Sequence, residues 1–128
     1  MREIKFKVWH IRERKMYFLE AIDMCFELVT VTKKNSDKQD YAAYFRFSEI
    51  ELMQYTGIQD KNGVEIYEGD IVKFISRFDD SKKMGTVRYW AGDAAFLIEC
   101  EREIFFLFYD ALNREVLGNI YETPELLQ

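Results

Sequence analysis

The sequence predicts a mainly β protein of the α+β class, in which an N-terminal β-hairpin or meander lobe precedes a small β-barrel. Alternation of apolar and charged residues at Ile4, Phe6 and Val8 marks a first half-buried strand. Several further short segments are rich in β-branched and aromatic residues, and glycine-containing turns separate those of the second half. With 128 residues, 16% aromatics and one proline, the chain can bury a core as one compact folding unit.

The N-terminal lobe is expected to span residues 1–57. Short polar connections separate its strands, and the all-polar segment 32–40 is the clearest loop in the chain. After the first strand, further strands are expected over residues 16–22, 24–31 and 41–47.

Residues 47–57 fit two interpretations. Ser48 and Glu51 match a helix capping box, and Gly57 is placed to close a short helix. Strands flank the segment, however, and it offers barely one apolar face. We therefore expect an extended stretch with at most one helical turn.

The C-terminal lobe is expected to span residues 58–128. Residues 109–116 are its best helical candidate, and Thr123 with Pro124 suits the N-cap and first residue of a final turn. Segment 102–108 either extends the strand before it or forms the next one. Strands are expected over residues 68–75, 85–90, 94–100 and 117–122.

The stretch Gln54–Val72 combines glycines with carboxylates and is interpreted as turn chemistry. Asn62-Gly63 predicts a hairpin with a type I′ turn, which requires positive φ at both residues. Two more glycines mark sharp bends, and two aspartates are placed to accept backbone N–H groups. The structural turn motif comprises Gly57, Asp60, Asn62, Gly63, Glu68, Gly69 and Asp70.

A catalytic interpretation of the same stretch is weaker. A small hydrolase would use an acid–base pair among Glu65, Glu68 and Asp70, since a close carboxylate pair raises one pKa. No nucleophile, basic partner or phosphate cradle accompanies these carboxylates. We therefore expect no enzymatic activity and no cofactor.

The remaining chemistry of the chain is sparse. His10 is the single histidine, so a four-ligand zinc site is not expected. Cys25 and Cys100 lie among apolar or strand-like neighbours, which favours free buried thiols. No apolar run is long enough for a bilayer and no signal core opens the chain, so the expected compartment is the cytoplasm.

Three parts of the sequence resemble the YopX family, small proteins of phages and prophages. They are "LMQYTGIQDKNGVEIYEGDIV" in the centre, "REIKFKVW" followed by "KMYFLEAI" at the start, and "VLGNIYETPELL" at the end. His10 departs from the pattern, because related sequences commonly carry Asp after this Trp. The resemblance implies a bacterial host cytoplasm and no established activity. The C-terminal part also resembles an SH3-like barrel, which carries no function by itself.

The leading functional hypothesis is a non-enzymatic protein-interaction module, whose partner is a host protein, a phage protein or a second copy of the chain. Aromatic residues dominate binding hot spots, and strand alternation sends Tyr89 and Trp90 to opposite faces, so that one packs inward and one points out. The candidate partner-binding surface comprises Tyr89, Trp90, Arg77 and Arg88.

The alternative hypothesis is a small barrel that binds nucleic acid on aromatics within a basic groove. Arg77, Lys82, Lys83 and Arg88 would supply the charge. The formal net charge of −5 and the neighbouring Asp79 argue against it.

Overall fold

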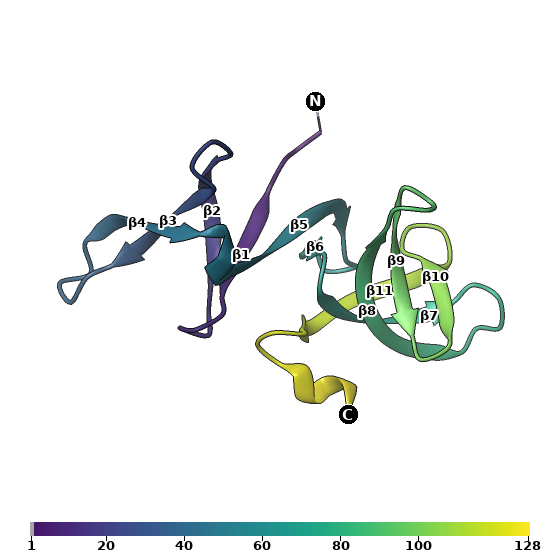
Figure 1. Cartoon of the computed structure of the whole chain (residues 1–128). Coiled ribbons are helices and arrows are strands. Elements are labelled where there is room, and N and C mark those ends of the chain that lie inside the picture. Colours follow the sequence, from purple (N-terminus) through teal and green to yellow (C-terminus); the bar gives the residue numbers. More distant parts are fainter. Residues whose placement is uncertain (1) are drawn as a thin grey trace. The chain divides into compact units, whose positions relative to one another are not determined.

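The computed structural model describes residues 2–128 and contains strands, turns and two short 3-10 helices, with no α-helix in that range (Figure 1). The mainly β prediction is confirmed, whereas no α component is present among these residues. The strands form two antiparallel sheets, with orders β4-β3-β2-β1-β5-β6 and β10-β9-β8-β7-β11. The chain divides into an N-terminal unit, residues 4–54, and a C-terminal unit, residues 55–128 together with residues 2 and 3.

The N-terminal unit is a meander, as predicted, because its first four strands are consecutive neighbours in the sheet. Its core consists of Val8, Val29, Val31, Phe45 and Ile50, which the alternation of each strand points to one face. The elements are β1 (Phe6–His10), β2 (Lys15–Asp23), β3 (Leu28–Lys34), β4 (Asp40–Arg46), η1 (Phe47–Glu49) and β5 (Ile50–Gln59), which continues into the C-terminal unit.

The ambiguous segment 47–57 is extended after one helical turn, as expected. The turn is η1, and β5 begins directly after it. The side chain that caps this turn is Glu49, whose Oε1 accepts the backbone N–H of Arg46 at 2.9 Å. The capping interaction therefore does not come from the predicted Ser48–Glu51 pair.

The C-terminal unit holds the second sheet. Its core gathers residues from every strand of that sheet, from β6 and from the loop after β10: Ile66, Val72, Phe74, Val87, Ile98, Cys100, Phe105, Leu107 and Ala111. The elements are β6 (Glu65–Tyr67), β7 (Asp70–Ser76), β8 (Lys82–Trp90), β9 (Ala95–Cys100), β10 (Glu103–Phe106), β11 (Ala111–Asn119) and η2 (Pro124–Leu127).

The predicted barrel is wrong, because this five-stranded sheet stays open with β10 and β11 as its edges. Closure would require these two strands to pair along their length. Instead, the Phe106 backbone N–H of β10 donates to the side chain of Asp110 at 2.9 Å. In β11 the register shifts twice, between Leu112 and Glu115 and between Val116 and Gly118.

The helix predicted over residues 109–116 is also wrong, because the chain from Ala111 forms β11 against β7. A helix of two turns is marginal in isolation, and pairing with β7 satisfies the backbone of both strands. The closing strand predicted over 117–122 ends at Asn119. The final turn is confirmed, since η2 begins at Pro124 after Thr123.

The turn at Asn62-Gly63 joins β5 to β6, but it is not type I′. Gly63 has φ +82°, whereas Asn62 does not have a positive φ. Gly63 donates its N–H to Asp60 O at 3.0 Å, and Asp60 donates its own to Val64 O at 2.7 Å. This pattern is a type I turn followed by a left-handed glycine, which needs positive φ at one residue only.

Candidate functional site

The carboxylate of Asp60 holds the central turn motif together. Oδ1 accepts the backbone N–H groups of Asn62 at 2.8 Å and Val64 at 2.9 Å, and Oδ2 accepts that of Val116 in β11 at 3.0 Å. Burial raises the pKa of Asp60, but the three backbone donors outweigh it and hold the pKa below its usual value. Asp60 therefore links the hairpin to an edge strand and has a structural use.

Asp70 has a similar position at the next turn. It is buried, and its Oδ2 accepts the Tyr67 backbone N–H at 2.8 Å. Gly69 has φ +91°, so the bend between Tyr67 and Asp70 needs a residue that tolerates the left-handed region. Glu68 lies in the same bend and is half-buried. A buried carboxylate bound to its own turn is poorly placed to meet a substrate, which favours the structural interpretation of this pair.

A separate feature of the C-terminal unit is an apolar cavity of about 520 Å³ beside the ends of β9 and β10. Four aromatic side chains contribute to its wall, and one of the lining residues, Asp110, is acidic. Phe108 and Tyr109 are both largely exposed to solvent. The lining residues are Ile58, Ala95, Phe96, Phe106, Leu107, Phe108, Tyr109 and Asp110.

Two polar side chains fix the loop that forms this wall. Asp110 accepts the Phe106 N–H at 2.9 Å and returns its own N–H to Phe106 O at 2.9 Å. Arg114 donates from Nη1 to the carbonyls of Leu107, Phe108 and Ala111 at 3.1, 3.3 and 2.9 Å. The cavity wall is therefore preformed, which lowers the entropy cost of binding.

Two of the four predicted surface residues contact side chains that line the cavity. The ring of Tyr89 packs edge-on against that of Phe96, with centroids 5.3 Å apart. The Arg77 guanidinium lies over the Tyr109 ring, 5.4 Å from its centroid, and no carboxylate among residues 2–128 forms an ion pair with it. The sequence reasoning missed the loop residues Phe108 and Tyr109, because it placed Tyr109 in a helix.

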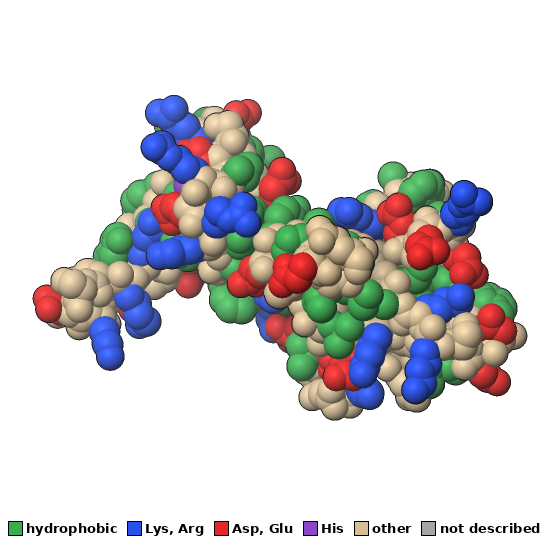
Figure 2. All heavy atoms as spheres, turned by 90° about the horizontal axis from the view of Figure 1, so that it is seen from below, with side chains coloured by type: hydrophobic (Ala, Val, Ile, Leu, Met, Phe, Trp, Pro, Cys, Tyr) green, Lys and Arg blue, Asp and Glu red, His purple; other side chains and the backbone are tan. Residues whose placement is uncertain are grey.

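The other two predicted residues lie apart from the cavity lining. Arg88 faces Glu99, with its Nε 3.9 Å from Oε2. Trp90 is 48% exposed and Tyr89 is 49% exposed. The expectation that one of these two rings would be buried is therefore wrong: Tyr89 shares its strand face with buried Val87, but it lies at the strand end where the core stops. Figure 2 shows hydrophobic side chains at the surface, interspersed with charged ones.

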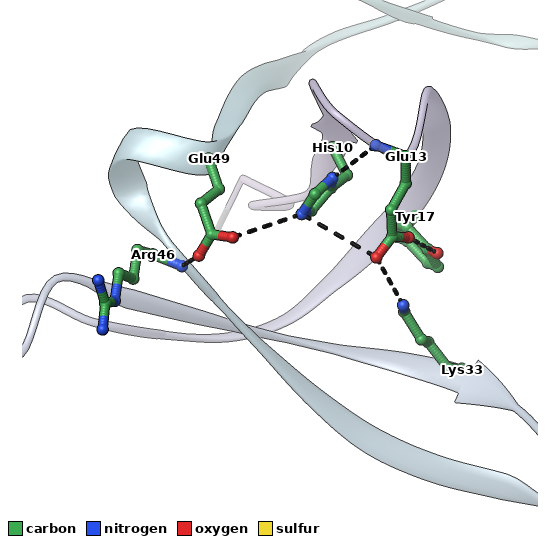
Figure 3. Close-up of polar contacts among 6 residues, drawn as sticks. All are labelled: His10, Glu13, Tyr17, Lys33, Arg46 and Glu49. Atoms are coloured by element: carbon green, nitrogen blue, oxygen red, sulfur yellow. Dashed lines mark hydrogen bonds and ion pairs between the residues drawn. The ribbon is translucent and has the colours of Figure 1, made fainter.

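A polar cluster in the N-terminal unit surrounds His10, which is 4% exposed (Figure 3). Its Nδ1 accepts the Glu13 backbone N–H at 3.0 Å, and its Nε2 lies 3.7 Å from Glu49 and 4.0 Å from Glu13 carboxylate oxygens. Glu13 also accepts from Tyr17 at 2.6 Å and from Lys33 at 2.7 Å. His10 thus caps the turn after β1 at the position where related sequences commonly carry Asp.

Burial raises the pKa of Glu13, but hydrogen bonds from Lys33 and Tyr17 outweigh it, so the pKa lies below its usual value. The carboxylate is therefore ionised and paired at neutral pH. No group of three or more His, Cys, Asp or Glu side chains within residues 2–128 is arranged to hold a metal ion. The cluster is best described as a hydrogen-bonded turn.

The two cysteines differ. Cys100 is a buried free thiol, as expected, and burial raises its pKa to about 11, while the charge of Lys83 opposes this. Cys25 is exposed, which corrects the expectation of burial, because it lies in the turn between β2 and β3. In the part of the chain that the structure describes, no helix has the length and apolar character to cross a membrane.

Comparison with known proteins decides the family. The model of the YopX protein family matches residues 5–128 of this chain. The chain belongs to the YopX family. Two solved structures are similar to this YopX-family chain over 100% of both chains: protein EF1440 from Enterococcus faecalis, at 24% identity and a TM-score of 0.61, and YopX from Bacillus subtilis, at 21% identity and a TM-score of 0.66. At these identities the likeness shows the fold alone. No curated protein matches the chain.

Proposed function

We propose that this protein is a non-catalytic protein-interaction module, in which the apolar cavity of the C-terminal unit accepts an apolar side chain of a partner protein. The observation that carries the proposal is the preformed aromatic wall around about 520 Å³ of open space. Aromatic side chains in a pocket are typical anchors of protein interfaces. The partner is a protein of a bacterial host or of a phage.

The charges at the rim favour an acidic neighbour beside that anchor. The Arg77 guanidinium lies over the Tyr109 ring, and the Arg114 guanidinium lies 5.9 Å from the Phe108 ring centroid, so both wall aromatics have a cation beside them. Arg77 has no acidic partner among the described residues and can pair with a partner's carboxylate. The proposed ligand segment is therefore an aromatic or leucine-like residue next to Asp or Glu.

Nucleic-acid binding is the weaker proposal. Of its expected cations, Lys83 forms an ion pair with Glu103 at 2.8 Å, and Arg88 lies 3.9 Å from Glu99. Paired cations contribute little to the phosphate contacts that dominate such binding. Retention on a nucleic-acid column that falls with added salt would favour this alternative.

The test is selection of displayed random peptides on the immobilised full chain. We expect enrichment of sequences with an aromatic or leucine anchor beside Asp or Glu. Binding of the selected peptide should fall at least about tenfold in Phe108→Ala and Tyr109→Ala, as for truncation of a hot-spot residue.

Phe26→Ala is the matched control, because Phe26 is an exposed aromatic residue of the N-terminal unit. It should leave peptide binding unchanged. Failure to enrich any such peptide would refute the proposal. Equal binding by wild type and Phe108→Ala would place the interaction elsewhere.

A further inference from the structure

The outer edge of β4 differs from the other sheet edges of the molecule. The edge strand β6 has only three residues, β11 is interrupted by two register shifts, and β10 has Asp110 bound to its Phe106 N–H. In contrast, β4 pairs with β3 over seven positions without a shift. A straight edge strand without proline or a bulge is a template for another strand.

The hydrogen bonds at the two ends of the β3–β4 ladder show which backbone groups face outward. Asn35 N–H donates to Gln39 O at 2.9 Å, and Phe47 N–H donates to Glu27 O at 3.0 Å. Along an antiparallel strand, the backbone N–H and C=O groups of successive residues point alternately to one side and to the other. The odd-numbered residues of β4 therefore point these groups towards β3. The even-numbered residues therefore face outward. Among them, Arg46 gives its N–H to Glu49, which leaves Ala42 and Tyr44 as the free centre of the edge.

We propose that β4 pairs antiparallel with β4 of a second copy of this chain, about a two-fold axis at Ala43. The strand reads "DYAAYFR", which is self-complementary in this register. Asp40 lies opposite the partner's Arg46, Tyr41 opposite the partner's Phe45, and Ala42 opposite the partner's Tyr44. The two ends thus pair opposite charges, with Asp40 shared between the partner's Arg46 and Lys34 of its own chain, whose Nζ lies 2.6 Å away.

The same register also matches the outward-pointing backbone hydrogen-bonding groups of the two strands. The outward-facing even residues meet each other, so Ala42 and the partner's Tyr44 exchange hydrogen bonds. Ala43 meets the partner's Ala43 as a pair without hydrogen bonds, where the two chains approach to about 4.5 Å between Cα atoms. A small side chain fits this close approach. The exposed Tyr44 ring then covers the small Ala42 of the other copy.

Shifted registers are less favourable. A shift by two residues in one direction places Arg46 opposite the partner's Lys38, and like charges that face each other destabilise a sheet. The opposite shift takes Asp40 beyond the end of the partner's β4. The charges of β4 therefore select the register centred on Ala43.

Sedimentation equilibrium of the full chain tests the pairing. We expect a monomer–dimer equilibrium, with a dissociation constant that Arg46→Asp or Asp40→Arg raises roughly tenfold, since each places like charges opposite each other at two symmetric positions. The double variant Asp40→Arg/Arg46→Asp exchanges the charges and should restore dimerisation. A wild type that stays monomeric overturns the proposal, as does a double variant as weak as the single ones.

A cysteine at the two-fold axis tests the register. In a Cys25→Ser background, Ala43→Cys should form a disulfide between copies under mild oxidation, because about 4.5 Å between Cα atoms lies within disulfide range. Ala42→Cys is the control, since Ala42 faces the partner's Tyr44 and not itself. Equal crosslinking by the two variants overturns the register.

Discussion

The Nδ1 atom of His10 accepts the backbone N–H of Glu13, 3.0 Å away, and so closes the turn between β1 and β2. An accepting Nδ1 carries no proton, so the neutral ring has its proton on Nε2. That nitrogen points towards the carboxylates of Glu49 and Glu13 (Figure 3). The single histidine of the chain is therefore a turn cap with a defined tautomer.

His10→Ala should destabilise the protein by about 2–4 kcal/mol, because it leaves a partly buried N–H unpaired and removes a buried ring. The ring packs against Phe45 with centroids 4.4 Å apart. His10→Asn should recover about 1 kcal/mol of this loss, since its Oδ1 can accept the same N–H. Urea unfolding of the three proteins measures the difference. Equal stability of the two variants would show that the hydrogen bond contributes nothing.

Asp60→Asn should destabilise the protein at pH 7 by about 1–3 kcal/mol, because Nδ2 cannot accept the Val116 N–H that Oδ2 now binds. The folded pKa of Asp60 is lowered, so its stabilisation is present above the unfolded value of about 3.9. It is lost as the pH falls through the lower folded value.

The difference between wild type and Asp60→Asn should therefore be largest near neutral pH and shrink below about pH 4. Urea unfolding from pH 7 to pH 2 measures it. Asp93→Asn is the control, because Asp93 is exposed and should give a small difference at every pH. A gap between wild type and Asp60→Asn that stays constant down to pH 2 would contradict the linkage.

The sequence predicted most of the strands, because alternation and turn residues act locally, although β3 (Leu28–Lys34) is shifted along the chain from the expected residues 24–31. The 3-10 turn at Pro124 followed from proline at its first position for the same reason. The predictions that failed depend on contacts between distant parts of the chain. Residues 111–119 form a strand because they pair with β7, about forty residues earlier in the chain, and the second sheet stays open because its edge strands β10 and β11 do not pair with each other.

The candidate site was predicted less completely for a similar reason. The sequence pointed to Tyr89 and Arg77, which reach the cavity only through Phe96 and Tyr109. Phe108 and Tyr109 were not selected, because their exposure depends on a loop fixed by Arg114. Three carbonyl contacts from one side chain leave no local pattern in a sequence.

Thiol labelling should distinguish the two cysteines. At pH 8 the exposed Cys25 should react readily in the folded protein, whereas Cys100 should react only on unfolding. Burial raises the pKa of Cys100 to about 11, so its reactive thiolate is scarce as well as inaccessible. Cys25→Ser should therefore show no reactive thiol until denaturant is added. Rapid labelling of folded Cys25→Ser would contradict the buried position of Cys100.

Substitution by alanine and by asparagine should affect stability in opposite orders at Gly118 and at Gly63. At Gly118 a Cβ would overlap Thr123 Oγ1 and lie 3.0 Å from Leu126 Cδ1, so the obstacles are the N-cap residue of η2 and a side chain within η2. Gly118→Ala should cost about 1–3 kcal/mol through overpacking, and Gly118→Asn should cost more.

At Gly63 a Cβ would meet nothing within 4 Å, but φ is +82°. Gly63→Ala should therefore cost about 1 kcal/mol from the backbone alone, and a similar cost is expected for Gly69→Ala at φ +91°. Gly63→Asn should cost less than Gly63→Ala, because asparagine tolerates the left-handed region. Urea unfolding of both pairs gives the order: alanine is the milder change at Gly118 and asparagine at Gly63. The same order at both positions would mean that one of them is not limited by the cause assigned to it.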